Sequence, residues 1–207
     1  MLDNQFYLSQ NETLKSIQNR RSIRTFTDKD VTEEDVLTLL HAANMAPSAH
    51  NQQSWRFIVL RGDKKAELVN LVSGNASQYS RPTAALLRMA ARSIASAPVV
   101  IAVMNTGELI RKGPELFAVE KNAARDFFRV MEIQSSAAAV ENMLIAATSI
   151  GLSSVWLGIL IMIQEEVLNF FEYPKGEFMA IVPIGYAAKE ASGPKKKLLD
   201  VIVKNLE

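Results

Sequence analysis

A long helix with almost no polar face is the feature that most constrains this fold. The apolar spacing predicts a helix over residues 122–150, which from Gln134 onward holds a single charged residue, Glu141. A helix that is apolar on nearly every side must be buried on nearly every side. The small side chains at residues 135–139 would also let a second helix approach closely. In a chain of 207 residues, this pattern predicts that the helix lies at the centre of a homodimer.

The chain also contains an uncharged run at residues 143–163, which is long enough to span a bilayer. Gly151, Ser153, Ser154 and Gly158 divide this run into a helix end and an extended piece, so we predict a buried core and no membrane partner. A small membrane protein is the alternative interpretation. The first residues, MLDNQFYLSQNE, have acids and amides where a signal peptide has basic residues, so we expect a cytoplasmic protein.

Helical and strand patterns alternate along the remaining sequence. Apolar spacing predicts helices at residues 11–19, 63–72 and 164–171, and Asp63 is predicted to cap the helix at 63–72. Two more helices are predicted, one that begins at Thr32 and one whose apolar face includes Leu86 and Ala95. Apolar runs predict strands at residues 55–60, 99–104, 153–161 and 178–184, with loops at residues 73–82 and 107–114. We find no repeat and no long linker. We therefore predict one α+β domain over residues 1–207, with a mixed central β-sheet flanked by helices.

The composition excludes several functions. Lys and Arg total 23 against 22 for Asp and Glu, so the net charge of +1 gives no field that would attract nucleic acid. Cysteine is absent, which excludes thiolate chemistry and Cys-based metal sites. With only two histidines, a metal centre is not expected either.

A polar connection at residues 44–59, NMAPSAHNQQSWRFIV, is the first candidate site. It lies between a predicted helix and a predicted strand, where a few turn residues would be enough. Amide and hydroxyl groups on a loop held by two rigid elements favour binding of a flat, hydrogen-bonding ligand. An ordinary turn with Trp55 covering the core is an equally acceptable interpretation, and His50 is placed where it could touch substrate.

Two basic segments form the second candidate site. Arg20, Arg21, Ser22 and Arg24 combine guanidinium groups with a hydroxyl, which suits a phosphate group. Residues 195–197 are three consecutive lysines near the other end of the chain. Solvated surface charge is the alternative for both segments. If they converge, they would form one phosphate site.

The segment GLSSVWLG at residues 151–158 is the third candidate, because its small residues would let backbone N–H groups approach a planar ring. A helix C-cap followed by a strand would explain it equally well. The sequence lacks GxGxxG after a strand and GxxxxGK[ST], so a Rossmann site and a P-loop are unsupported. It has no GxSxG elbow, although its two histidines leave a Ser-His-Asp arrangement open.

Four motifs occur in order along the chain: RRSIRTF at 20–26, APSAHNQQSW at 46–55, GLSSVWLG at 151–158, and PIGY at 183–186 followed by the lysine tail. In these motifs the chain resembles the FMN-dependent nitroreductase family, over about residues 13–203. The resemblance implies an intertwined homodimer with FMN at the subunit interface. Two departures concern Ser54, where the family often has Pro, and Lys197, where it often has Arg. Lysine keeps the charge but loses the bidentate fork, so we expect weaker phosphate affinity.

The resemblance also implies roles for individual residues. Arg20 and Ser22 would hold the FMN phosphate with Arg21 beside them, and Lys195 and Lys197 would complete the clamp. Arg24 would lie toward the N1 and O2 edge of the flavin. The other subunit would line the ring with Pro47, Ser48 and Ala49 and donate hydrogen bonds near it from Asn51 and Gln53. Backbone N–H groups around Leu157, Gly158 and Ile159 would point at flavin N5 and O4.

The activity implied by the resemblance is a ping-pong oxidoreductase. NADH or NADPH would pass a hydride to flavin N5, and a nitroaromatic, a quinone or a similar small-molecule acceptor would then take the electrons. No catalytic side chain is expected, because the flavin performs the chemistry. The alternatives are another reaction at the same flavin (dehalogenation, ring oxidation or flavin destruction) and a flavin-binding protein without turnover.

Overall fold

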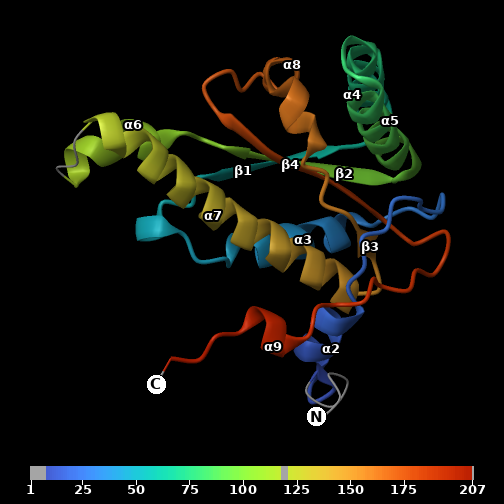
Figure 1. Ribbon diagram of the computed structural model, residues 1–207. Helices are drawn as coiled ribbons and strands as arrows, with labels where there is room; N and C mark the ends of the chain where they lie inside the picture. The colour runs from blue at the N-terminus through green and yellow to red at the C-terminus, as the bar shows by residue number, and fades with distance from the viewer. Residues whose placement is uncertain (1–7, 118–120, 207) are drawn as a thin grey trace.

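The computed structural model describes residues 8–117 and 121–206 and contains a β-sheet between two layers of helices (Figure 1). The strands are β1 (Trp55–Leu60), β2 (Val99–Asn105), β3 (Ser153–Ser154) and β4 (Glu177–Gly185). The α-helices are α2 (Glu12–Asn19), α3 (Glu33–Asn44), α4 (Gly62–Asn75), α5 (Arg81–Ser96), α6 (Glu108–Leu116), α7 (Lys121–Ser149), α8 (Gln164–Phe170) and α9 (Leu199–Ile202). The 3₁₀ helices are η1 (Ala49–Asn51), η2 (Ala76–Gln78) and η3 (Ile159–Ile163). The predicted α+β fold class is confirmed.

The strands lie in the order β1-β2-β4-β3, and each neighbouring pair is antiparallel. Among the described residues, the parallel component of the predicted mixed sheet is limited to an isolated bridge between Ser22 and Ser154. A register shift between Val103 and Met104 interrupts the pairing of β2 with β4. Residues 1–7, on which part of the signal-peptide prediction rests, lie outside the described residues.

Strand β2 forms the centre of the core, and all of its residues are buried. Val99, Ile101 and Val103 point to the layer of α3 and α7, because alternate side chains of a strand face opposite sides of the sheet. Val100 and Met104 point to the layer of α4, α5, η3 and α8. The uninterrupted apolar run in the sequence therefore reflects burial on both faces.

Helix α7 is 29 residues long and runs across one face of the sheet, with α3 beside it (Figure 1). It ends at Ser149, and Gly151 follows with a left-handed φ of 79°, so the predicted division of the uncharged run is confirmed. Within residues 8–117 and 121–206, no helix is long and apolar enough to cross a membrane.

The prediction of a loop at residues 107–114 is wrong, because α6 occupies most of it and contains Pro114. The carboxylate of Glu132 on α7 replaces the missing local cap. It accepts hydrogen bonds from the N–H of Gly107 at 3.0 Å and of Leu109 at 2.8 Å. Gly113 allows α6 to pack closely, since a Cβ there would lie 2.7 Å from ring atoms of Phe128. Contacts with a distant helix therefore make this segment helical.

Other boundaries also differ from expectation. Helix α4 begins at Gly62 and has no side-chain cap, so Asp63 lies in its first turn instead of capping it. The predicted loop at residues 73–82 is mostly helical, with the end of α4, then η2, and then the start of α5. The predicted strand at 153–161 is shorter than expected, because only Ser153 and Ser154 form β3, Leu157 adds an isolated bridge to Ile181 of β4, and η3 begins at Ile159. Leu86 and Ala95 point away from the buried face of α5.

Thr32, by contrast, caps α3 as predicted. Its hydroxyl accepts from the N–H of Asp35 at 3.0 Å, and the Asp35 carboxylate accepts from the N–H of Thr32 at 3.3 Å. Both residues of this capping box lie within four positions of the sequence, so the start of α3 could be predicted from the local pattern alone.

The buried Glu132 should make stability depend on pH. Burial raises the pKa of Glu132 above its usual 4.5, although hydrogen bonds from Leu109 and Gly107 oppose the rise. Because the folded pKa is above the unfolded one, the stabilisation linked to this group is complete below the unfolded pKa and is lost as pH rises through the folded pKa. We expect Glu132→Gln to lower the free energy of unfolding by about 1–3 kcal/mol, since the amide NH2 would face one of the two N–H donors, whereas either oxygen of a protonated carboxyl can still accept.

Denaturant unfolding of both proteins from pH 5 to pH 8 checks this. The difference between wild type and Glu132→Gln should be larger at the acidic end. Glu141→Gln, on the same helix but half-exposed, is the control for loss of a carboxylate. A difference that grows as pH rises would contradict the assignment.

Candidate functional site

The basic residues at 20–24 follow the end of α2 and are hydrogen-bonded to the segment at 151–158, which follows α7. Ser22 forms a bridge with Ser154, and the N–H of Ile23 donates to the Ser154 carbonyl at 3.0 Å. Arg20 Nε lies 3.6 Å from a carboxylate oxygen of Glu141 on α7. Two of the predicted site segments, residues 20–24 and 151–158, therefore lie side by side.

The tail after β4 returns to the same place. A Cβ on Gly193 would lie 2.7 Å from Arg21 Nε, so the tail backbone passes directly against this guanidinium. Arg21 Nη1 donates to the carbonyl oxygens of Gln18 at 2.6 Å and of Arg20 at 2.8 Å. A cavity of about 440 Å³ opens beside Arg21. The exposed residues 195–197 begin two positions after Gly193, so basic segments from opposite ends of the sequence come together.

Backbone groups are available at the third predicted segment. The N–H of Leu157 is used within the sheet, where it donates to Ile181 at 2.9 Å, and the Leu157 side chain is buried. Gly158 is exposed and is the N-cap residue of η3, whose N-terminus has no side-chain cap. Because the first N–H groups of a helix lack intrahelical partners, those that follow Leu157 can donate to a ligand.

The loop at residues 47–53 is held in an unusual conformation. His50, Asn51 and Gln53 have left-handed φ angles of 50°, 55° and 48°. Ser48 Oγ accepts from the N–H of Gln53 at 3.1 Å, and Gln53 Nε2 donates to Asn51 Oδ1 at 2.9 Å. Each such non-glycine residue costs on the order of 1 kcal/mol and persists only where contacts enforce it. The loop therefore presents two exposed amide side chains in a fixed arrangement.

This loop is attached to both α7 and α6. Ser135 Oγ on α7 accepts from the N–H of Ala49 at 3.0 Å. The ring of His50 lies 4.2 Å from the ring of Phe117, next to the end of α6. Below the loop, Trp55 is 3% exposed and its Nε1 donates to Asn44 Oδ1 at 3.0 Å. The interpretation that Trp55 covers the core is therefore confirmed, whereas ligand binding by the loop stays a prediction.

The two parts of the predicted site are far apart within one chain (Figure 1). The loop meets α7 at Ser135, whereas the cavity beside Arg21 is lined by Thr148. Thirteen residues of helix separate these positions, which is about 20 Å along the axis. The structure therefore brings Arg20, Arg21, Ser22, the segment 157–159 and the tail to one place, and Pro47, Ser48, Ala49, Asn51 and Gln53 to another.

Sequence reasoning missed the residues that hold these parts. Ser135 was interpreted as a small residue for helix contact, but its hydroxyl anchors the loop. Glu141 was noted only as an isolated charge, and it contacts Arg20. A lone charge in a long apolar run is a signal that a partner of opposite charge lies nearby.

Comparison with known proteins gives consistent results. A protein of Archaeoglobus fulgidus named for NADH dehydrogenase and NAD(P)H nitroreductase activity is 30% identical over 148 residues, which is 72% of this chain and 68% of that protein. A protein of the same name from Methanothermobacter thermautotrophicus is 29% identical over 185 residues, covering 88% of this chain and 81% of that one. A Desulfovibrio desulfuricans structure, described as a nitroreductase in complex with FMN, has a TM-score of 0.68 at 27% identity and covers 96% of this chain and 99% of that one.

The fold and these relatives define the class of the protein, an α+β oxidoreductase. The model of the Nitroreductase family matches residues 17–186. The chain belongs to the Nitroreductase family.

Proposed function

We propose that this chain is an FMN-dependent oxidoreductase that takes a hydride from NADH or NADPH and passes the electrons to a small-molecule acceptor. Family membership and the FMN-bound relative support the cofactor. The observation that carries the proposal is the presence of two complementary half-sites, one basic and one rich in amides, about 20 Å apart on α7. In this proposal, residues 1–207 act as one FMN-binding domain.

The basic half-site fits the phosphate of FMN. Arg20 has one guanidinium edge near Glu141 and is partly exposed, which leaves donors for a phosphate oxygen. Ser22 adds a hydroxyl, and Lys195 and Lys197 supply exposed ammonium groups from the tail. Arg21 lies among them but donates to two backbone carbonyls, so it contributes charge and holds the turn.

The amide half-site fits the isoalloxazine ring. Asn51 and Gln53 are hydrogen-bonded to each other and present exposed polar groups, and in this proposal Pro47, Ser48 and Ala49 line the ring beside them. The uncapped start of η3 at Gly158 and Ile159 offers N–H donors to a ring. Arg24 is exposed, and in this proposal its positive charge lies toward the N1 and O2 edge of the flavin.

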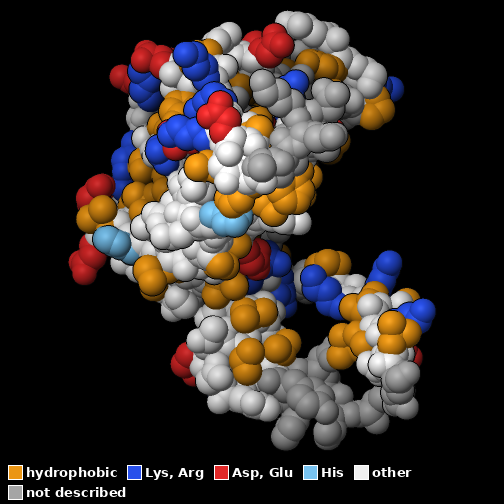
Figure 2. Space-filling model, turned by 90° about the vertical axis from the view of Figure 1, so that its left-hand side faces the viewer, with side chains coloured by type: hydrophobic (Ala, Val, Ile, Leu, Met, Phe, Trp, Pro, Cys, Tyr) orange, Lys and Arg blue, Asp and Glu red, His pale blue; other side chains and the backbone are white. Residues whose placement is uncertain are grey.

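One FMN needs both half-sites, so we propose that two chains form each site. The outer face of α7 supports this homodimer, because Ile133, Ala137 and Ile145 are only partly buried and Val130 is 47% exposed. The tail supports it too. Leu199, which is 61% exposed, belongs to an exposed run at residues 198–203, apolar except for Asp200, that projects from the body (Figures 1 and 2). An apolar arm of this kind is expected to pack on the partner subunit.

FMN supplies hydride transfer at its N5 when bound. The chain's own residues hold the ring between the two half-sites, place N–H donors and a cation at its polar edges, and exclude water through dimer packing. In the proposed ping-pong cycle, the oxidised nucleotide leaves before the acceptor enters the same open face. Nitroaromatics, quinones and similar planar acceptors suit such a face, because they can stack on a flat ring.

The visible spectrum of the purified protein tests this function. We expect a yellow protein, or one that becomes yellow when FMN is added. NADH or NADPH should bleach it anaerobically, and a nitroaromatic or a quinone should restore the colour. A colourless protein that takes up no FMN would contradict the proposal. A yellow protein that neither nucleotide bleaches would favour flavin binding without turnover.

A further inference from the structure

His50 is the one titratable side chain of the loop at residues 47–53, and the proposed flavin site leaves it unused. The other residues of this loop are Pro, Ser, Ala, Asn and two Gln, none of which exchanges a proton near neutral pH. Imidazole does, because histidine is the side chain whose charge ordinarily changes between about pH 5 and pH 8. The loop therefore carries a single group that can give a proton to a ligand.

The backbone on both sides of His50 is fixed. The N–H of Ala49 donates to Ser135 Oγ at 3.0 Å, and the N–H of Asn51 donates to the Ser48 carbonyl at 3.0 Å. His50 itself has the left-handed φ of 50°, a conformation that histidine adopts more often than most non-glycine residues. The bond from its Cα to its Cβ therefore has one direction, set by the fold.

An aromatic surface supports the imidazole ring from one side. The ring of His50 lies 4.2 Å from that of Phe117 at an angle of 35°. The ring of Phe117 lies 5.7 Å from that of Phe128, which is completely buried. His50 is exposed, and within residues 8–117 and 121–206 neither of its ring nitrogens has a hydrogen-bond partner. The ring is thus held by packing, and its nitrogens are available to a ligand.

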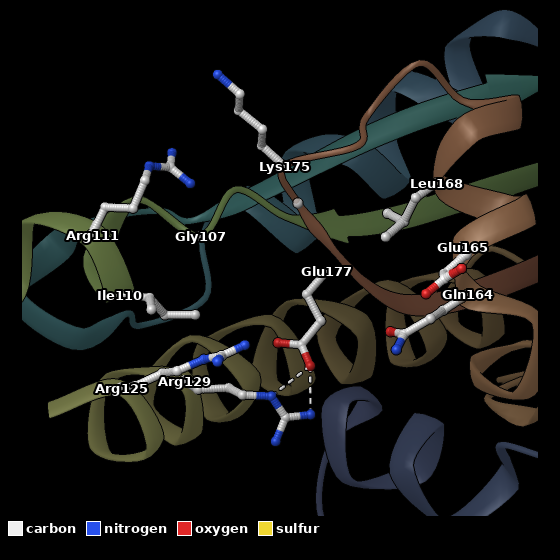
Figure 3. A pocket seen from close by; sticks show the side chains of 11 residues that line it. Gly107, Ile110, Arg111, Arg125, Arg129, Gln164, Glu165, Leu168, Lys175 and Glu177 are labelled. Carbon is white, nitrogen blue, oxygen red and sulfur yellow. Dashed lines mark hydrogen bonds and ion pairs between the residues drawn. The ribbon is translucent and has the colours of Figure 1, made fainter. Parts of the chain in front are cut away.

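Helix α6, which ends just before Phe117, takes its position from α7. It packs on the ring of Phe128, and the carboxylate of Glu132 caps its N-terminus. A cavity of about 540 Å³ beside Arg129 separates α6 from α8 (Figure 3). Because α7 also anchors the loop, both supports of His50 belong to one helix.

Reduction of a quinone by hydride transfer needs a proton as well as a hydride. The hydride adds to one quinone oxygen, and an electron pair moves through the ring to the other oxygen, which takes the proton to give the hydroquinone. A side chain that donates this proton contributes about 10²–10⁴-fold to the rate. The donor must lie at the edge of the stacked acceptor, because the oxygens of a quinone lie in the plane of its ring.

His50 is placed at the edge of the proposed ring site. In the proposed dimer, Ala49 and Asn51 lie against the flavin, and consecutive Cα atoms are about 3.8 Å apart, so His50 starts within about 4 Å of both. Its imidazole packs on Phe117, whereas the amides of Asn51 and Gln53 pair with each other. The imidazole therefore lies beside the residues that face the ring, where the edge of a stacked acceptor would lie.

We propose that His50 donates the proton when the acceptor is reduced. Its imidazolium gives an N–H proton to the acceptor oxygen as the hydride arrives, and the neutral imidazole regains a proton from water. This inference rests on the proposed function, because the hydride comes from the reduced flavin. It replaces the expectation that no side chain takes part in the chemistry.

Stopped-flow reoxidation of the reduced holoenzyme tests this step. The holoenzyme is reduced anaerobically with a stoichiometric amount of dithionite and mixed with tetramethyl-1,4-benzoquinone, whose reduction consumes protons, or with ferricyanide, which takes electrons alone. His50→Asn should slow reoxidation by the quinone about 100-fold and leave reoxidation by ferricyanide unchanged. Asparagine tolerates the left-handed backbone and keeps a polar group, but it cannot transfer a proton.

His41→Asn is the matched control, since His41 is exposed on α3 and belongs to neither half-site. It should be reoxidised by both acceptors at the wild-type rates. If wild type binds no FMN, or if neither acceptor reoxidises it, the proposed function itself fails and this inference fails with it.

Imidazole NMR signals give a readout without turnover. The chain has two histidines, so the spectrum of His41→Asn assigns the signals of both. When tetramethyl-1,4-benzoquinone is added to the oxidised holoenzyme, the ring nitrogen signals of His50 should shift and those of His41 should not.

Three results would overturn the inference while leaving the proposed function intact. One is reoxidation of His50→Asn by the quinone at the wild-type rate. Another is an equal loss with quinone and ferricyanide, which would show general damage to the flavin site. The third is a quinone that binds without shifting the His50 signals.

Discussion

Replacing Arg20 with leucine is expected to weaken FMN binding by about 100-fold, because a charge-assisted contact to phosphate is among the strongest polar interactions. The location of Arg20 and its partial exposure support this role. Arg20 stands at the end of α2 beside Ser22, its guanidinium is one-quarter exposed, and Glu141 holds one edge of it at 3.6 Å. Titration of FMN-free protein with FMN measures the change.

Two further variants sharpen this prediction. Arg20→Lys keeps the charge and loses the fork, so its affinity should lie between those of wild type and Arg20→Leu. Arg92→Leu removes an exposed cation from α5 and should leave FMN affinity unchanged. Equal affinities for Arg20→Leu and Arg92→Leu would show that Arg20 does not hold the phosphate.

Replacing Trp55 with alanine should lower the free energy of unfolding by about 3–5 kcal/mol, because it removes a large buried side chain. Trp55 is 3% exposed, its ring packs 6.5 Å from that of Phe57, and its indole N–H donates to Asn44. Denaturant unfolding measures the loss. Trp55→Phe should lose much less, since it keeps most of the apolar contact.

A substitution of Asn51, in the same stretch as Trp55, should affect FMN binding and not stability. Asn51→Gly keeps the left-handed backbone, at a φ of 55°, and removes the amide. Stability should change little, whereas FMN affinity or the rate of flavin reduction should fall. Similar losses in the free energy of unfolding for Trp55→Ala and Asn51→Gly would contradict this assignment of stability to Trp55 and of FMN binding to Asn51.

Most elements of the core could be predicted from sequence because their causes are local. Strand β2 is buried on both faces and is therefore apolar throughout. Thr32 and Asp35 cap α3 within one turn. Helix α6 could not be predicted, since it contains Pro114 and Glu132, its cap, lies 25 residues from Gly107.

The candidate site could be predicted less completely. The motifs pointed to the segments that bear its polar groups, and the polar loop was visible as an excess of amides. Neither spacing nor periodicity could show that Ser135 would fix that loop on α7. The cavity beside Arg129 was not predicted at all, because Arg111 and Lys175, which both line it, are 64 residues apart in sequence.

Helix α7 connects the two half-sites as a continuous rod, from Ser135 at the loop to Thr148 beside Arg21. Inserting or deleting one residue between these points would rotate one half-site about 100° relative to the other and shift it by about 1.5 Å. Insertions and deletions should therefore not be tolerated in this segment, whereas the surface loops should tolerate them. Homologous chains that differ in length should carry their gaps in loops and conserve the number of residues between the positions of Ser135 and Thr148.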